Sequence, residues 1–325
     1  MRLLVLRFSA LGDVAMTVPV LRAFAAANPT VDVTVVSKSF HAPLFEDFHF
    51  RGFNLNDARY RGPLGIVHLI ADIDLSQYDA VADLHDVLRT QAIRTVARLR
   101  GLQTSHIRKN RKARKALTRP NDKVLTPHHT SFEKYTAALT ALGLTNPWPE
   151  GIPLAAPRPA TTVTAIGIAP FAAHKGKIYP IEKMEQVVRT LSDRGIDTWL
   201  FGGGGTELAT LQQWAERYAN VHLARECCRN LSDELHLMST LRLMLSMDSA
   251  NMHLASLVGT RVVSIWGATH PLAGFMGWQQ SESDALQLNL PCRPCSIFGS
   301  KPCLRGDYAC MTGIDPELIV KHITE

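Results

Sequence analysis

Short apolar runs rich in β-branched residues alternate with segments of helical periodicity, and this alternation limits the fold more than any other sequence feature. In the first half the predicted strands are 2–8, 31–36 and 78–85, and the predicted helices are 9–27 and 87–101. In the second half the predicted strands are 164–170, 197–203, 242–247 and 260–267, and the predicted helices are 181–195 and 250–259. Repeated strand–helix alternation favours parallel sheets with helices on both faces.

A proline-rich stretch at 145–162 separates the two alternating halves, with five prolines in eighteen residues. Such a stretch is typical of a domain border. A chain of 325 residues is also long enough for two domains. We therefore expect an α/β protein with two Rossmann-like domains at 1–157 and 158–325, with the last helix packing back on the N-terminal domain.

The composition is that of an ordinary globular protein, with 46% hydrophobic and 20% charged residues, which excludes a disordered or fibrous chain. The apolar start is interrupted by Arg7 and Asp13 before it reaches the length of a membrane helix, and it lacks a signal-peptide pattern. A cytoplasmic location is expected. The net charge of +6 is uneven, because residues 1–150 carry 20 Lys or Arg against 13 Asp or Glu. The two domains are thus expected to have different partners.

In doubly wound sheets, ligands bind at the loops that leave the carboxyl ends of the strands. The first such loop contains Gly12 and Asp13, where Asp13 is either a helix cap or a general base. The second, 170–180, contains Lys177 and is either a solvated basic turn or a phosphate clamp.

The third loop contains four consecutive glycines, including Gly203 and Gly204, which allow close approach of a ligand to the backbone. It is neither a dinucleotide fingerprint nor a P-loop. Glu207 either contacts a ribose or is a first-turn acid on the helix dipole. In the fourth loop Asp248 or Ser249 can cap a helix whose amides favour a pyrophosphate, and His253 is either structural or functional.

Several segments resemble glycosyltransferase family 9, whose best-known members are the ADP-heptose:lipopolysaccharide heptosyltransferases. The similar segments, in chain order over nearly the whole sequence, are 7–22, 83–89, 131–144, 177–180, 248–260 and 266–271. The resemblance implies a GT-B fold, in which two Rossmann-like domains face a central cleft. It also implies an acceptor on the N-terminal domain and a nucleotide-sugar on the C-terminal one.

Matched position by position, the resemblance implies that Asp13 is the catalytic base of an inverting transfer, with Ser9 and Gly12 on the acceptor side. It implies a donor site that needs no catalytic metal, formed by Lys177, Gly203, Gly204, Glu207, Asp248, Ser249, Ala250 and His253. Ala250 replaces the usual glycine of the family motif, and 171–174 lack the hydroxyl residues of some heptosyltransferases, which leaves the donor sugar open. The alternatives are a non-catalytic nucleotide- or sugar-binding protein and, less favoured, a dinucleotide-dependent oxidoreductase.

Residues 108–119 hold seven Lys or Arg and no acid. This segment is either a solvated loop or a binding surface. Without interleaved aromatic residues it does not favour nucleic acid. If the chain acts as the resemblance to family 9 implies, a glycolipid acceptor or the anionic inner leaflet of the cytoplasmic membrane is expected to be attracted by Arg108, Lys109, Arg111 and Lys112. The protein is then peripheral at that membrane, and a monomer is expected.

Four cysteines near the C-terminus, Cys292, Cys295, Cys303 and Cys310, follow the pattern C-x2-C-x7-C-x6-C. Four thiolates can form a tetrahedral structural zinc site. Free thiols and disulfides are the alternatives, and the spacing does not decide among the three.

Overall fold

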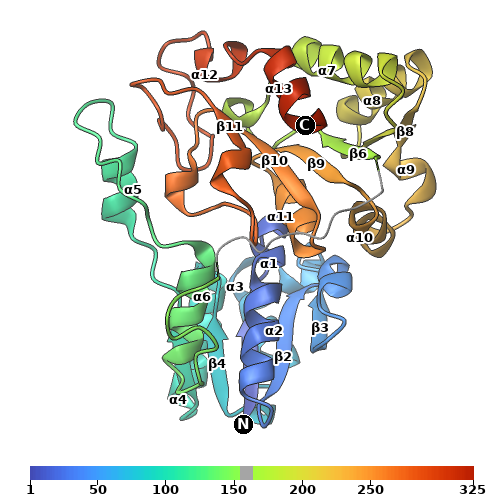
Figure 1. The fold of residues 1–325 in the computed structure, drawn as a ribbon. Helices are drawn as coiled ribbons and strands as arrows, with labels where there is room; N and C mark the ends of the chain where they lie inside the picture. The colour runs from blue at the N-terminus through green and yellow to red at the C-terminus, as the bar shows by residue number, and fades with distance from the viewer. Residues whose placement is uncertain (154–163) are drawn as a thin grey trace. The chain divides into compact units, whose positions relative to one another are not determined.

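The computed structural model describes residues 1–153 and 164–325. They form two compact units, of which the first comprises Met1–Lys109 and Ser131–Ile152 and the second Asn110–Thr130 and Pro153–Glu325 (Figure 1). Each unit contains one parallel sheet with helices, so the predicted α/β class with two parallel sheets is confirmed. The predicted boundary at residue 157 lies outside the described residues.

The first unit has a five-stranded sheet in the order β3-β2-β1-β4-β5, with every neighbouring pair parallel. Its strands are β1 (Arg2–Leu6), β2 (Asp32–Lys38), β3 (His49–Phe53), β4 (Ala80–Asp83) and β5 (Gln103–His106). Its α-helices are α1 (Leu11–Ala15), α2 (Thr17–Ala27), α3 (Gly62–Ile73), α4 (Leu88–Leu99) and α6 (Ser131–Thr140). Strand β1 is central and its last four residues are buried, as expected for a strand covered on both faces.

The second unit has a six-stranded parallel sheet in the order β11-β10-β9-β6-β7-β8. Its strands are β6 (Ile166–Ala169), β7 (Thr198–Leu200), β8 (Val221–Leu223), β9 (Leu243–Met247), β10 (Arg261–Trp266) and β11 (Ala285–Gln287). Its α-helices are α5 (Arg111–Leu117), α7 (Ile181–Asp193), α8 (Thr206–Arg217), α9 (Ala224–Cys227), α10 (Leu231–Ser239), α11 (Ala250–Leu257), α12 (Ala309–Thr312) and α13 (Pro316–Thr324).

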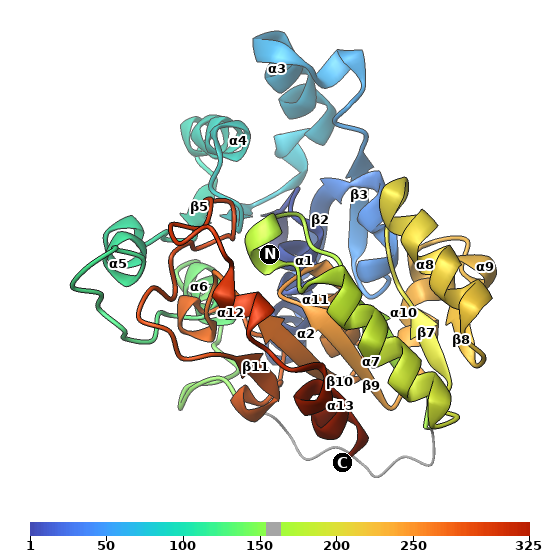
Figure 2. The same ribbon diagram turned by 90° about the horizontal axis from the view of Figure 1, so that it is seen from above.

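The last helix, α13, packs against α7 within the second unit (Figure 2). Its buried residues Ile319, Val320 and Ile323 belong to the same apolar cluster as Val187 and Leu191 of α7. This packing accounts for the apolar face of α13 within the second unit. The expected contact of the last helix with the N-terminal domain stays a prediction.

The segment 110–130 is continuous in sequence with the first unit but packs on the second. The guanidinium of Arg114 lies 5.6 Å from the ring centroids of both Phe275 and Phe298, and the amide of His128 donates to the Leu272 carbonyl at 2.8 Å. The segment carries six Lys or Arg and one Asp. Much of the positive charge in the first half of the sequence therefore belongs to the C-terminal unit.

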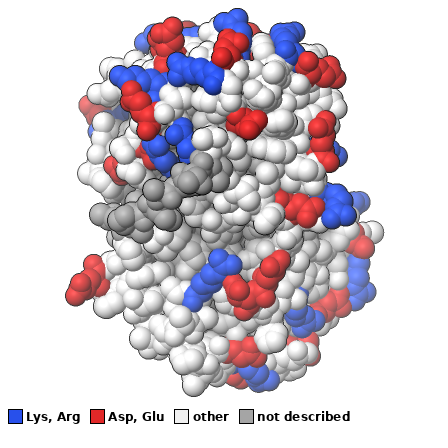
Figure 3. All heavy atoms as spheres, turned by 45° about the vertical axis from the view of Figure 1, so that its right-hand side comes forward, with Lys and Arg blue, Asp and Glu red and all other residues white. Residues whose placement is uncertain are grey.

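In the described part of the chain, no helix is both long and apolar enough to cross a membrane. Acidic and basic side chains are interspersed on the face shown in Figure 3, and neither sign forms a continuous patch there.

We expect Gly274→Ala to weaken the packing of the segment 110–130 on its unit. Gly274 has a φ of +81°, and a Cβ there would lie 2.6 Å from the His129 carbonyl oxygen and 2.9 Å from the Thr130 Cα. The combined strain and clash should cost about 1–3 kcal/mol. The measurement is the thermal unfolding midpoint together with the rate of tryptic cleavage after the basic residues of the segment.

Gly204→Ala is the matched control for this prediction, because nothing lies within 4 Å of a Cβ at Gly204. The control should unfold and digest like the unchanged protein. Equal behaviour of both variants would contradict the packing of the segment on this unit.

Candidate functional site

The loop that follows β1 positions Asp13 at the carboxyl end of the central strand of the first sheet. The loop leads into α1, whose N-cap is Ala10, so Asp13 lies in the first turn and is not the cap residue. Its Oδ2 accepts a hydrogen bond from the Ala10 amide at 3.4 Å, and its side chain is 35% exposed. The carboxylate is thus accessible to a substrate while one oxygen is held by the loop.

Arg7 holds the other oxygen of Asp13. Its Nη2 lies 2.9 Å from the Asp13 Oδ1, and its side chain is only 7% exposed. The same guanidinium donates to the Leu84 carbonyl and lies 5.8 Å from the centroid of the Tyr135 ring. Tyr135 in turn donates its hydroxyl to the Asp13 carbonyl at 3.3 Å. Charge-assisted bonds of this kind fix the orientation of a carboxylate.

A neutral histidine lies beside this loop. The Ser9 Oγ and the His85 Nε2 are 3.2 Å apart. His85 follows β4, and its amide is held at 3.0 Å by the carboxylate of buried Asp83. Burial, with Arg7 and Lys109 adding to it, lowers the pKa of His85 to about 3. The imidazole is therefore uncharged at neutral pH, and its contact with Ser9 is a hydrogen bond between neutral groups.

The residues predicted for the acceptor divide between the two units. Ser9 and Gly12 share the Asp13 loop, and Lys109 of the same unit donates to the Asp86 carbonyl at 2.6 Å. Arg111 and Lys112 lie on α5 in the second unit. Arg108 remains in the first unit. The predicted acceptor residues therefore belong to both units.

In the second unit, the two predicted donor-phosphate loops are neighbours because β6 and β9 pair directly. Lys177 ends the short 3-10 helix Lys175–Lys177 after β6, and Asp248 follows β9. The Lys177 Nζ lies 2.9 Å from the Asp248 Oδ2, with side chains only 16% and 4% exposed. The pair joins the two loops and fixes the ammonium at the carboxyl edge of the sheet.

Helix α11 begins directly after Asp248. Ser249 occupies its N-cap position in an extended conformation, but its side chain makes no capping bond and its Oγ lies 3.2 Å from the Ser246 Oγ. Ala250 is the first helical residue, and His253 is buried on the first turn. The positive end of α11 thus lies next to the Lys177–Asp248 pair, an arrangement suited to an anionic group.

The glycine loop follows β7, which neighbours β6 on the other side. The Gly203 amide donates to the Glu207 Oε2 at 3.1 Å, so the carboxylate closes the loop on itself. Gly205 has a φ of +67°, and neither Gly204 nor Gly205 would place a Cβ within 4 Å of another atom. The loop presents bare backbone at the same edge of the sheet as Lys177.

The four C-terminal cysteines line one small cavity, and all four are free thiols. Among the residues that the structure describes, no three His, Cys, Asp or Glu side chains are already arranged to hold a metal ion. The first three cysteines lie in the irregular segment between β11 and α12, and Cys310 lies on α12.

The sequence profile of "Glycosyltransferase family 9 (heptosyltransferase)" matches residues 66–301, most of the chain. This chain belongs to glycosyltransferase family 9. A comparison with curated protein sequences returned no match.

Solved structures show the same fold across the chain. The E. coli heptosyltransferase WaaC with ADP has a TM-score of 0.69 at 19% identity, covering 100% of this chain and 99% of that one. E. coli ADP-heptose lipopolysaccharide heptosyltransferase II gives 0.68 at 16% identity, covering 100% and 98%. A family 9 glycosyltransferase of Veillonella parvula gives 0.71 at 20% identity, covering 98% and 95%. The predicted GT-B fold is thereby confirmed.

Sequence patterns did not single out Arg7, His85 or Tyr135 in this family 9 protein. Each lies in a segment that resembles the family, but their roles depend on contacts between β1, β4 and α6. For Arg7 the sequence does contain a local signal, which is a cation directly after an apolar strand. In the structure this side chain is buried and paired with the Asp13 carboxylate.

His85 should make stability depend on pH. Its pKa of about 3 in the folded state lies below the ordinary value of 6.5, so the unfolded chain binds more protons between these values. Its contribution to stability is complete above pH 6.5 and is lost as the pH falls toward 3. At pH 5 the loss should be about 1 kcal/mol after allowance for partial exposure.

His85→Gln should remove this part of the stability loss between pH 7 and pH 5, measured by denaturant unfolding at both values. The exposed residue His106 supplies the control variant, His106→Gln, which should behave like the unchanged protein. The interpretation fails if His85→Gln and the unchanged protein lose the same stability.

Proposed function

We propose that this family 9 glycosyltransferase moves a heptose or a related sugar, with inversion, from a nucleotide-diphosphate donor to a lipopolysaccharide core or a similar surface glycan. The observation that carries the proposal is the buried Lys177–Asp248 pair beside the start of α11. This arrangement offers an ammonium and helix amides at one point, as a diphosphate requires.

The donor is proposed to bind through its diphosphate at Lys177 and the amides of Ser249 and Ala250, with the glycine loop and Glu207 near the nucleoside. Two relatives support an ADP-linked heptose. WaaC was solved with ADP, and the other E. coli relative is described as an ADP-heptose transferase. Because Ala250 and residues 171–174 depart from the family pattern, the proposal includes sugars related to heptose.

In the proposed reaction the acceptor hydroxyl attacks the anomeric carbon while the nucleotide diphosphate leaves from the opposite face. Asp13 accepts the hydroxyl proton as the new C–O bond forms. Arg7 keeps the Asp13 carboxylate oriented for this step. Lys177 and the α11 amides stabilise the negative charge on the departing diphosphate as the old C–O bond breaks.

These protein groups supply the base and the counter-charge, so the proposed step uses no catalytic metal and no cofactor besides the donor. A structural zinc at the four cysteines would supply no reacting group to this step. The same groups would also serve a protein that binds the nucleotide-sugar without reacting. The carboxylate of Asp13 distinguishes the two functions, because only the transferase needs a base.

The acceptor is proposed to approach the Asp13 loop through Ser9 and Gly12, with Arg108 and Lys109 available for its anionic groups. We propose in addition that the α5 cations draw the protein to an anionic membrane surface on the cytoplasmic side. The segment 110–130 carries six Lys or Arg against one Asp, which supports this proposal.

Asp13→Asn should lower kcat for sugar transfer by about 10²–10⁴-fold, because the amide cannot accept the hydroxyl proton. Donor affinity should change little, since no donor contact is assigned to Asp13. The measurement is transfer from a nucleotide-sugar under single-turnover conditions, with folding checked by thermal unfolding. The exposed ion-paired residue Asp47 gives the control variant Asp47→Asn, which should keep full activity. Undiminished transfer by Asp13→Asn would disprove the assignment of the base.

Binding to vesicles tests the membrane proposal. The protein should bind vesicles of anionic lipid at low salt and dissociate as salt is raised. Arg111→Gln combined with Lys112→Gln should weaken binding by about tenfold or more, given roughly 1 kcal/mol for each basic residue at the surface. The control changes Arg98 and Arg100, exposed cations near the end of α4, to Gln. Equal binding to neutral vesicles, or none at low salt, would contradict the proposal.

A further inference from the structure

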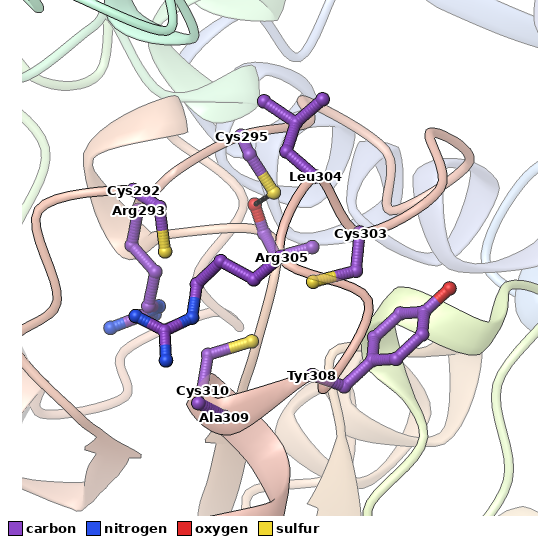
Figure 4. A pocket seen from close by; sticks show the side chains of 10 residues that line it. Cys292, Arg293, Cys295, Cys303, Leu304, Arg305, Tyr308, Ala309 and Cys310 are labelled. Carbon is purple, nitrogen blue, oxygen red and sulfur yellow. Dashed lines mark hydrogen bonds between the residues drawn. The ribbon is translucent and has the colours of Figure 1, made fainter.

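We propose that Cys292, Cys295, Cys303 and Cys310 together bind one structural divalent metal ion of the zinc class. The four thiols line a single cavity of about 10 Å³. Figure 4 shows their sulfur atoms turned toward the same space. A cavity of this size accommodates about one small atom, and four thiolates are a complete tetrahedral ligand set for zinc.

A buried cation beside the cavity points to a negative charge in it. Arg293 is only 4% exposed, and its guanidinium donates only to neutral oxygens. Within the described residues it forms no ion pair. A buried charge without a counter-charge is costly.

A second cation approaches the same cysteines from the segment 110–130. The Lys123 Nζ donates to the Pro294 carbonyl at 3.0 Å, and no described carboxylate pairs with it. Arg305 does not add to this charge, because it pairs with Asp307 at 2.9 Å.

A divalent ion with four thiolates carries a net charge of −2. Arg293 and Lys123 lie beside the cysteines, and among the described residues neither forms an ion pair with a carboxylate. Binding displaces four thiol protons to solvent as four metal–sulfur bonds form. Buried Arg293 and partly exposed Lys123 therefore favour the metal-bound, deprotonated cluster.

Metal binding must draw the four sulfurs together, because no three of them are yet spaced as ligands. Rotation about one Cα–Cβ bond between staggered positions moves a Cys sulfur by about 3 Å. Sulfur atoms that already line one cavity can approach one another by such rotations. The cysteines lie in irregular backbone apart from Cys310, so the segment can adjust.

The cluster supports the loop that carries Lys177, a consequence that rests on the proposed donor site. The Cys295 amide donates to the Ala268 carbonyl at 3.0 Å, and the Ala268 amide donates to the Gly176 carbonyl at 2.8 Å. Gly299 lies so close to the Lys177 stem that a Cβ there would be 2.6 Å from its Cγ. A metal ion that fixes this segment would therefore position Lys177.

The test is elemental analysis of the full chain purified without chelator. We expect about one zinc or iron per chain, falling below about a tenth in Cys303→Ser and Cys310→Ser. Cys227→Ser is the matched control, because Cys227 is exposed and lies outside the cavity, and it should keep the metal. Chelation should also lower the thermal unfolding midpoint of the unchanged protein.

Alkylation of the unchanged protein provides a measurement that needs no variant. The four cluster thiols should react with iodoacetamide at least about tenfold more slowly before chelation than after it, while Cys227 reacts equally in both cases. A chain that remains metal-free after incubation with zinc, or disulfides among the four cysteines in mass spectra, would overturn the proposal. Sugar transfer by the metal-free protein would leave the proposed function intact, so the two can fail separately.

Discussion

The ion pair between Lys177 and Asp248 is the interaction on which the proposed donor site depends. It joins the loops after β6 and β9, two strands that pair directly, and both side chains are largely buried. Removing one partner would leave the other charge uncompensated in a poorly solvated place. The pair keeps an ammonium fixed beside the start of α11 before any ligand arrives. An ammonium held in place in this way would need little reorganisation for the proposed binding and release of a diphosphate.

Other parts of the second unit maintain this geometry. Gly176 allows the chain to pass between Ala268 and Gly299, where a Cβ would lie 2.9 Å from each neighbour's nearest atom. Through Ala268 the loop is tied to Cys295 and the proposed metal cluster. The first unit also has a parallel sheet with helices, but the loop after its central strand holds a carboxylate. There Arg7 orients the Asp13 carboxylate, which suits a base for an acceptor hydroxyl.

Much of the architecture could be predicted because buried parallel strands leave a clear apolar signature. β1, β6 and β9 were predicted within a few residues of their observed bounds. The edge strands β3, β5, β8 and β11 were missed because they are short and partly exposed, so their sequences carry polar residues. The packing of 110–130 on the second unit has no local signal, since it arises from Phe275 and Phe298, more than a hundred residues away. The contact between His85 and Ser9 was missed for the same reason, because the two residues are far apart in the sequence.

The most direct test of the central claim is a calorimetric titration of the protein with nucleoside diphosphates. The account predicts that one of them binds, and that Lys177→Ala weakens it by about 10–100-fold, as expected for the loss of a charge-assisted bond to phosphate. Lys175→Ala, two residues away on the same turn, should bind like the unchanged protein. No binding of any nucleoside diphosphate, or equal binding by Lys177→Ala, would contradict the account.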